Sequence, residues 1–304
     1  MVDFNLFLLY NIYGDSMATK NKKNIRIRKW VKVLFFLIVI ISSIYLYSKY
    51  LGPKGLVIKE EAIIDSKIPS NFYGLKIVHM SDIHYKVTTT KEDLENIVNE
   101  INLLKPDIVI YSGDLFDSDI KYTKKDYKDL TNILKKIDYN IDKFAIKGED
   151  DNNKEWDNII NNSEFTNLND NYEFIYNEGN EPILLVGISS NYKKKHIKET
   201  LNSIYKEINT EYKYSILIIH EPDIINSIDY SKFNLILAGH THGGQIKLPF
   251  IGGIIKDKYS KIYTNAYYDL ESSKLYISSG IGTTKYKYRL LNKPSINFYR
   301  LRNK

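Results

Sequence analysis

The stretch Ala238-Gly239-His240-Thr241-His242-Gly243-Gly244-Gln245 directly follows an apolar run at residues 235–238. The run is short and continuous, which favours a buried strand that ends at Gly239. Two histidines, one residue apart, leave the strand end in a glycine-rich turn. Neutral imidazole is a common metal ligand, and glycine lets the backbone approach an ion closely. The stretch therefore indicates a candidate metal site, although histidine pairs also occur at helix caps and on surfaces.

Four more polar motifs also follow apolar runs, each at the end of a predicted strand. They are Asp82-Ile83-His84, Gly113-Asp114-Leu115-Phe116-Asp117, Gly148-Glu149-Asp150-Asp151 and Ile219-His220-Glu221. Helical spacing over residues 91–104, and a second predicted helix over 124–137, separate the first three motifs. Strand, carboxylate-bearing loop and helix thus repeat, which predicts a layered α/β protein. Because ligands of such folds gather beyond the carboxyl ends of the strands, we expect a site there.

The remaining segments predict further strands and one more helix. Strands are expected over residues 56–64, 172–176, 182–187, 214–219, 261–268, 274–279 and 295–301, the first of them at a sheet edge. Residues 195–208 predict a helix, and the Asn-rich residues 152–171 predict a helix-and-loop region. The sequence contains no internal repeat.

Composition limits the classes of function. The chain has 304 residues, a formal net charge of +6 and no cysteine. This length allows one large domain or two small ones. Much of the positive excess lies near the amino end, so no nucleic-acid partner is indicated. The absence of cysteine excludes thiolate chemistry, disulfides and cysteine-bound zinc.

Residues 30–50 predict a transmembrane helix. They are predominantly apolar, close to the roughly 20 residues that cross a bilayer, and have aromatic residues near both ends. A buried core helix and a cleaved signal peptide are the alternatives, but no small-residue cleavage site follows the apolar run. Basic residues precede the run, so the positive-inside rule predicts a cytoplasmic amino end and an extracytoplasmic remainder. The sequence thus predicts a single-pass protein of the cell membrane.

Four regions follow from this assignment. Residues 1–29 form a cytoplasmic basic segment, of which 1–16 are expected to be a mis-called start, because Met17 opens the basic run. Residues 30–50 are the transmembrane helix, and residues 51–73 are a linker with an edge strand. Residues 74–304 form the main domain.

The polar residues at strand ends comprise three carboxylates and four imidazoles. They are Asp82, His84, Asp114, Glu149, His220, His240 and His242. Mixed oxygen and nitrogen ligands suit manganese, iron or zinc, whereas calcium prefers oxygen alone. Seven ligands exceed one tetrahedral site, so we expect two divalent metal ions about 3.5–4 Å apart, bridged by one carboxylate. Such a pair activates water and supports in-line displacement at phosphorus.

In order and spacing, from about residue 74 to the end, these motifs resemble the calcineurin-like metallophosphoesterase superfamily. The segment 279–284, with Arg289 and Pro294, resembles its small membrane-associated phosphodiesterase branch. The resemblance implies a four-layer α/β/β/α sandwich of two mixed sheets. It implies a metal-dependent phosphodiesterase or phosphatase in which a metal-bridging hydroxide attacks a phosphate ester. It also implies a first metal on Asp82, His84 and His242, a bridging Asp114, and a second metal on His220 and His240.

The third motif departs from the family pattern. Glu149 and Asp150 stand where the family carries an Asn and a His that contacts the phosphate or protonates the leaving group. Glu149 can still bind the second metal, whereas an ionised Asp150 repels phosphate, and Asp117 loses its usual partner. Asp150 and Asp117 are therefore the candidate catalytic residues. The open explanations are a leaving group that needs no acid, a protonated Asp150, reduced activity, or a substitute acid from Asp151, Lys147 or Lys154.

Three functions follow as hypotheses. The first is a membrane-anchored phosphoesterase, the second a metal-binding but catalytically weak phosphate-ligand sensor, and the third a lipid-pyrophosphate hydrolase at the membrane. The natural substrate, the metal and the oligomeric state have no decodable signal in the sequence. Elsewhere, we expect His79 to lie in the core, His196 and the run 193–195 on the surface, and Gly280 and Gly282 in turns.

Overall fold

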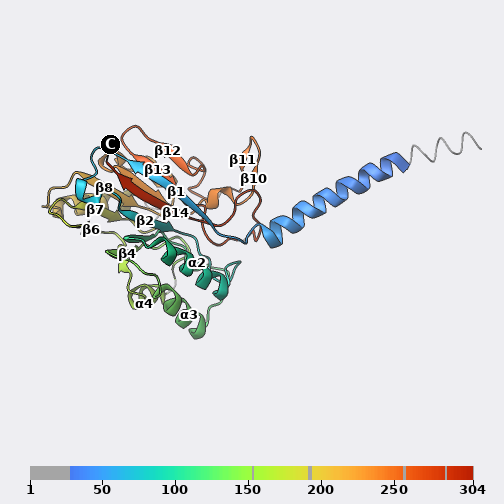
Figure 1. Cartoon of the computed structure of the whole chain (residues 1–304), viewed down its shortest axis with the longest axis horizontal. Helices are drawn as coiled ribbons and strands as arrows, with labels where there is room; N and C mark the ends of the chain where they lie inside the picture. The colour runs from blue at the N-terminus through green and yellow to red at the C-terminus, as the bar shows by residue number, and fades with distance from the viewer. Residues whose placement is uncertain (1–27, 153, 191–193, 256–257, 285, 304) are drawn as a thin grey trace, which may run out of the picture. The chain divides into compact units, whose positions relative to one another are not determined.

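The structure, a computed structural model, describes residues 28–152, 154–190, 194–255, 258–284 and 286–303. The chain divides into two compact units, Met1–Ser48 and Lys49–Lys304 (Figure 1). The predictions for residues 1–16, for nearly all of the basic segment 1–29 and for Lys193 lie outside the described residues.

The helix Arg28–Leu51 is long and apolar enough to cross a bilayer. It has 24 residues and contains an 18-residue window with a mean hydropathy of 2.2, and large apolar side chains such as Phe35 and Leu34 are exposed along it. Its last turn, Tyr47–Leu51, is the π-helix η1. The helix covers the predicted span 30–50.

The first sheet has six strands in the order β1-β14-β2-β3-β4-β5. Their bounds are β1 (Val57–Ile64), β2 (Lys76–Met80), β3 (Ile108–Tyr111), β4 (Asp142–Ala145), β5 (Thr166–Asn167) and β14 (Ser295–Arg302). β2 to β5 run parallel, whereas β14 is antiparallel to β2 and parallel to β1. The motifs after β2, β3 and β4 therefore emerge at one edge. Because β1 pairs with β14, the predicted boundary at residue 74 falls inside a compact unit.

The second large sheet also has six strands, in the order β12-β13-β9-β8-β7-β6. Their bounds are β6 (Asn171–Ile175), β7 (Ile183–Gly187), β8 (Tyr214–Ile218), β9 (Leu235–Ala238), β12 (Tyr267–Asp269) and β13 (Lys274–Ile277). The central strands β7, β8, β9 and β13 run parallel, and both outer strands are antiparallel. A separate hairpin pairs β10 (Lys247–Leu248) with β11 (Gly252–Gly253).

Helices and short turns complete the compact unit. The α-helices are α2 (Lys91–Leu104), α3 (Lys124–Leu134), α4 (Trp156–Asn162) and α5 (Lys194–Glu207). The 3₁₀ turns are η2 (Ser70–Phe72), η3 (Pro222–Ser227), η4 (Tyr230–Lys232) and η5 (His242–Gly244). α2 and α3 each begin with a capping box, in which Thr90 pairs with Asp93 and Thr123 with Asp126.

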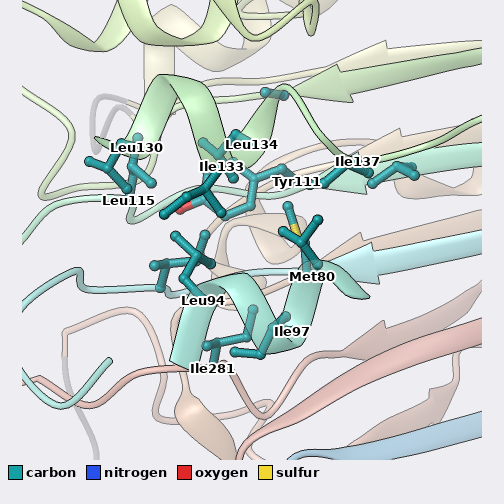
Figure 2. Packing of buried hydrophobic residues seen from close by; sticks show 14 of the residues in the cluster. Met80, Leu94, Ile97, Tyr111, Leu115, Leu130, Ile133, Leu134, Ile137 and Ile281 are labelled. Carbon is teal, nitrogen blue, oxygen red and sulfur yellow. The ribbon is translucent and has the colours of Figure 1, made fainter. Parts of the chain in front are cut away.

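Three apolar layers hold the sheets and helices together. In the first, Leu94 of α2 and Leu130 of α3 pack with Met80 and Tyr111 on the outer face of the first sheet (Figure 2). Alternate strand residues point the other way, because side chains alternate across a strand. Ile110 therefore belongs to the middle layer, between the two sheets.

The third layer lies on the outer face of the second sheet. There Leu217 and Ile236 pack with Ile197 and Leu201 of α5. Helices, sheet, sheet and helix thus stack in four layers, each boundary closed by buried apolar side chains. The predicted α/β/β/α sandwich of two mixed sheets is confirmed.

Two sequence predictions were wrong in their extent. The helix expected over 124–137 ends at Leu134, where Lys143 Nζ approaches the carbonyls of Leu134 and Ile137 at 3.4 and 3.3 Å. The strand expected over 261–268 is reduced to β12. The amides of residues 261–263 are instead bound by the carboxylate of Asp223, so they are not free for a sheet ladder.

Lys143 provides a test of how the end of α3 is held. Its side chain is fully buried, and its ammonium group donates to carbonyls at the carboxyl end of the helix. Replacing Lys143 by Met removes the donor from both carbonyls. Leu134 O keeps its bond from Ile137 N, whereas Ile137 O loses the Lys143 donor, and we expect the fold to be destabilised by about 1–3 kcal/mol. Urea unfolding of the full-length protein measures the change. Lys135→Met, which breaks an exposed ion pair with Glu164, is the matched control with a much smaller expected effect. Equal effects would contradict the assignment.

Candidate metal centre

The polar motifs converge where strand ends of both large sheets meet. Asp82 and His84 follow β2, and Asp114 follows β3. His220 follows β8, and His240 and His242 follow β9. All six side chains belong to residues that are at most 3% exposed. The first sheet therefore supplies mainly carboxylates to the junction, and the second supplies imidazoles.

Two fully buried groups of potential ligands lie side by side at this junction, and a third, less buried group consists of His84, Asp117 and Asp150. The first contains Asp82, His84 and His242, and the second contains Asp114, His220 and His240. Within each group, the candidate ligand atoms lie within 4.8 Å of one another. Two contacts between side chains connect the groups: His84 Nε2 lies 3.6 Å from Asp114 Oδ2, and His220 Nε2 lies 3.9 Å from Asp82 Oδ1.

The backbone turns sharply at most of these residues. Positive φ angles occur at Asp82 (53°), His84 (39°), Asp114 (61°), His240 (65°) and His242 (47°). Such conformations cost on the order of 1–3 kcal/mol each in a non-glycine residue, and they cluster at functional sites. The chain thus leaves β2, β3 and β9 in strained turns that carry ligand side chains at the junction.

Two glycines allow the neighbouring loops to approach. Gly113, at φ 104°, lies against the backbone of Gly148, and a side chain at Gly113 would overlap Gly148. A side chain at Gly148 would in turn overlap the carboxylate of Asp114. Asp114 can reach the centre only because both neighbours lack a Cβ atom.

Three histidine rings are oriented by backbone carbonyls. His84 Nδ1 lies 3.0 Å from Phe116 O, His220 Nδ1 lies 2.7 Å from Ser112 O, and His240 Nε2 lies 2.6 Å from Lys258 O. A carbonyl only accepts, so each of these ring nitrogens carries a proton. The opposite nitrogen of each neutral ring then presents a lone pair to the junction, as histidine ligands of metals do.

The donor set fits divalent cations. His220 Nε2 lies 3.0 Å from Asp114 Oδ2 and has no hydrogen-bond partner among the described residues. With Nδ1 protonated, a neutral His220 places a lone pair against a carboxylate oxygen, and this contact is favourable only with positive charge between them. The contact of His84 Nε2 with His242 Nε2, at 3.2 Å, differs, because Arg289 faces His242 Nδ1 as a donor and the Nε2–H of neutral His242 can donate to His84 Nε2. A cation shared by such nitrogen and oxygen atoms removes the repulsion.

The pKa values of His220 and Asp114 also indicate that positive charge is favoured between these two residues. Burial opposes the charged imidazolium of His220, but the adjacent Asp114 carboxylate raises its pKa well above the usual range. Burial raises the pKa of Asp114 to about 7. Burial also lowers the pKa of His84 to about 4, so this ring is neutral at physiological pH. Asp114 and His220 therefore hold a proton between them in the metal-free protein, and a metal ion would compete with that proton.

Asp151 positions the loops that carry Asp114. Its buried carboxylate accepts from the backbone N–H groups of Asp114 (2.8 Å), Leu115 (2.8 Å), Phe116 (3.2 Å) and Gly148 (2.9 Å). Four donors occupy both of its oxygens, so Asp151 is not available as a substitute acid. Lys147 is also directed elsewhere, since its ammonium group pairs with Asp157 at 2.9 Å.

Arg289 contacts His242 of the first ligand group. It is fully buried and donates to the carbonyls of Ser279 (2.8 Å), Gly280 (3.1 Å) and Asn292 (3.3 Å). Its Nη2 also lies 3.3 Å from His242 Nδ1. Burial lowers its pKa to about 10, so it stays charged at neutral pH. The sequence singled out Arg289 only through the family resemblance and gave no role for it.

The atypical third motif lies at the rim of the centre. Glu149 Oε1 is 3.6 Å from His240 Nδ1, on a side chain that is 31% exposed, and Glu149 belongs to neither compact ligand group. The carboxylates of Asp117 and Asp150 lie 3.7 and 4.0 Å from His84 Nδ1. Burial, reinforced by the carboxylates of Asp117 and Glu149, raises the pKa of Asp150 to about 6.

The histidines outside the centre behave as expected. His79 is buried, and its Nε2 lies 2.8 Å from Ser112 Oγ. Burial lowers its pKa to about 3, so it is a neutral core residue. His196 lies on the surface, with a side chain that is 42% exposed, and faces the carboxylate of Asp170 at 3.4 Å.

Comparison with known proteins shows the family of the chain. The calcineurin-like phosphoesterase family model matches residues 75–244. An uncharacterized metallophosphoesterase of Bacillus subtilis (strain 168), YkuE, is 32% identical over 265 residues, which cover 85% of this chain and 90% of the relative. An uncharacterized metallophosphoesterase of Campylobacter jejuni is 29% identical, covering 92% of this chain and 72% of the relative. Among solved structures, a dimetal phosphatase from Danio rerio is 10% identical with a TM-score of 0.37, covering 69% of this chain and 88% of the other.

Metal removal tests whether the centre needs a cation. We expect a chelator to lower the melting temperature of the full-length protein and Mn²⁺ or Zn²⁺ to restore it. Saturation at 100 times the dissociation constant stabilises by about 2.7 kcal/mol, because the ion binds only the folded state. For a protein of this size that is roughly 5–10 °C. His220→Gln should reduce the shift, and His196→Gln, at a surface histidine, should not. An unchanged melting curve of the wild type with and without metal would contradict the assignment.

Proposed function

The chain belongs to the calcineurin-like phosphoesterase family, and from this premise we propose that it is a membrane-anchored, metal-dependent phosphoesterase with a dinuclear centre. The observation that carries the proposal is the pair of adjacent ligand groups, three residues each, with their histidine rings oriented by backbone carbonyls. Such a pair of sites is suited to phosphoryl transfer, because both the attacking and the leaving oxygen need stabilisation.

The ligand assignment follows the two groups. Asp82, His84 and His242 would hold one divalent ion, and His220 and His240 the other. Asp114 would bridge, because its Oδ2 faces His84 of the first group and His220 of the second. Glu149 would complete the second site from the rim. Divalent ions in such sites act as Lewis acids on phosphoryl oxygens and generate the nucleophile from water. Mn, Zn and Fe all suit this donor set.

Asp150 would supply the proton for the leaving group. Its carboxyl has a pKa raised to about 6, so a substantial fraction stays protonated in mildly acidic solution. Asp117 shares the rim, and burial raises its pKa as well. Two neighbouring carboxyl groups that disfavour double ionisation can hold one proton between them. Above the pKa of Asp150, the ionised group repels the phosphate instead.

The charge at the rim favours diesters over monoesters. Glu149, Asp150 and Asp117 place three carboxyl groups where the family carries a neutral Asn and a His beside one carboxylate. A phosphodiester carries one negative charge, whereas a monoester approaches two at neutral pH, because its second pKa is about 6. Repulsion by the rim therefore acts more strongly on the monoester, which supports phosphodiesterase activity within the broader phosphoesterase class.

The membrane topology is part of the same proposal. The helix Arg28–Leu51 contains an apolar window of 18 residues, and the basic run ends at Lys32, before most of this window. The positive-inside rule then places the amino end in the cytoplasm and the compact unit Lys49–Lys304 outside.

The replacement of the family His by Asp150 favours a second candidate, a metal-binding phosphate-ligand sensor with weak catalysis. In that case the centre retains its ions and binds a phosphate group, but leaving groups that need protonation depart slowly. A lipid-linked pyrophosphate as substrate is compatible with the apolar helix and has no residue of its own to support it.

Substitution of Asp114 tests the dinuclear centre. With full-length protein in detergent, we expect Mn²⁺- or Zn²⁺-dependent hydrolysis of an aryl phosphodiester. Asp114→Ala should reduce kcat/KM more than about 100-fold, because even the loss of groups that only orient metal ligands costs about 10–100-fold. Lys86→Ala, which removes an exposed ion pair with Asp126, is the control that should keep wild-type rates. Absence of turnover with every metal and ester would leave only the sensor.

Substitution of Asp150 separates the two candidates. If Asp150 is the acid, kcat/KM for an alkyl diester, whose leaving group needs a proton, should decrease as pH rises through about 6 in the wild type. Asp150→Asn should then be slower below pH 6, with no such decrease. Under the sensor hypothesis, Asp150→His should instead raise the rate by about 100-fold, the usual contribution of a positioned acid. Loss of existing activity in Asp150→His would exclude that hypothesis.

A further inference from the structure

The β10–β11 hairpin carries apolar side chains that are exposed to solvent. Its strands, Lys247–Leu248 and Gly252–Gly253, are joined by a tip that includes Phe250 and Ile251. Phe250 is fully exposed, Ile251 is 74% exposed, and Ile254 just beyond the hairpin is 52% exposed. Contiguous exposed apolar side chains of this kind mark a surface that another body covers.

The tip is held in this position at a conformational cost. Phe250 has a φ of 67°, in the left-handed region that a bulky residue rarely adopts. Its ring gains no burial within the compact unit that would offset the cost. The outward position of the ring is therefore accounted for by a contact outside the compact unit.

The base of the hairpin is fixed to the metal centre. Gly244, in the turn that begins with His242, and Gly253 of β11 approach so closely that a Cβ on either would overlap the other. Ile254 N donates to Ile246 O at 2.9 Å, and Lys247 N donates to Leu290 O at 2.9 Å. The hairpin and the histidine turn are thus packed backbone to backbone.

The same edge receives the chain from the apolar helix. Val57 N, at the start of β1, donates to Pro294 O at 2.9 Å, and Pro294 lies four residues after Leu290 at the hairpin base. Only five residues lie between Leu51, the end of the helix, and Val57, a distance of at most roughly 20 Å. In Figure 1 the hairpin and the start of β1 lie at the same end of the compact unit. Leu291, between Leu290 and Pro294, is 61% exposed and adds to the apolar surface.

The charges around the tip are almost all positive. Residues 246–261 and 283–294 contain seven Lys residues, the buried Arg289 and a single acid, Asp257. Lys258, Lys287 and Lys293 are exposed among them. An apolar tip bordered by lysines is the composition of segments that insert into the headgroup region of a bilayer with anionic lipids. A protein partner would need acidic groups to match, whereas a bilayer already adjoins the helix.

We propose that the β10–β11 hairpin is a second membrane contact, which inserts Phe250 and Ile251 into the interface of a bilayer containing anionic lipids. The contact sets the orientation of the compact unit, and the rigid base then holds the histidine turn close to the headgroups. This docking is independent of the proposed hydrolytic function. A second copy of the chain is the competing occupant of the surface.

The absence of cysteine makes the contact directly measurable. Ile251→Cys is labelled with an environment-sensitive fluorophore in the full-length protein, reconstituted into vesicles of phosphatidylcholine and phosphatidylglycerol. Leu103→Cys is the matched control, because Leu103 is an equally apolar residue, also 74% exposed, at the carboxyl end of α2. Phe250→Cys repeats the measurement at the neighbouring position. Wild-type melting temperatures show that the labelled proteins are folded.

The expected result is quenching by doxyl-labelled lipids at 251 and 250 that exceeds quenching at 103 by about three-fold or more, since interfacial side chains lie about 5–10 Å into the headgroup boundary. Equal quenching at 251 and 103 would overturn the proposal. The proposal would also be overturned if the fluorophore at 251 were shielded from water without quenching by lipids, and if Ile251→Cys formed disulfide crosslinks between copies. That result would assign the surface to a second copy of the chain.

Discussion

The close approach of lone-pair-bearing atoms at the junction of the two sheets is the constraint on which the rest of the structure depends. Asp114 Oδ2 and His220 Nε2 are only 3.0 Å apart, and both are buried. Positive charge must lie between them, either as a proton or as a metal ion. The strained strand ends, the glycines that admit Asp114 and the carbonyls that orient the rings all hold these atoms together. The folded chain therefore holds these atoms where a cation is favoured.

Much of this arrangement is predictable because its signals are local. Each ligand lies a few residues beyond an apolar run, and parallel strands deliver such residues to one edge. The roles of Asp151 and Arg289 could not be predicted in this way, because their partners are backbone groups brought near by the fold. Asp151, for example, accepts from amides about 36 residues earlier in the chain. The errors at residues 135–137 and 261–266 have the same origin, since the polar groups of Lys143 and Asp223 capture backbone that a local pattern assigns to a helix or a strand.

The third motif shows how one substitution changes the electrostatics of a whole rim. In the absence of the family His, His84 Nδ1 is the nearest imidazole nitrogen, and it is already directed to a carbonyl. Asp150 is therefore left among carboxylates, and desolvation with like charge raises its pKa toward neutrality. An ionised Asp150 weakens phosphate binding, but the same carboxylates and burial that raise its pKa allow Asp150 to be protonated near neutral pH. Substrate charge and acid strength are thus coupled through one side chain.

Arg289 connects the centre to the outer part of the compact unit. A buried guanidinium without a carboxylate partner at hydrogen-bond distance is costly, and here carbonyls of residues 279–292 offset the cost. Those carbonyls belong to the segment that leads from β13 past the hairpin base to β14, so the charge holds this segment against His242. The ligand turn, the hairpin and the strand that pairs with β1 then share one rigid anchor. The hairpin is thus connected to the first ligand group by the contact of Gly253 with Gly244 and by the contact of Arg289 with His242.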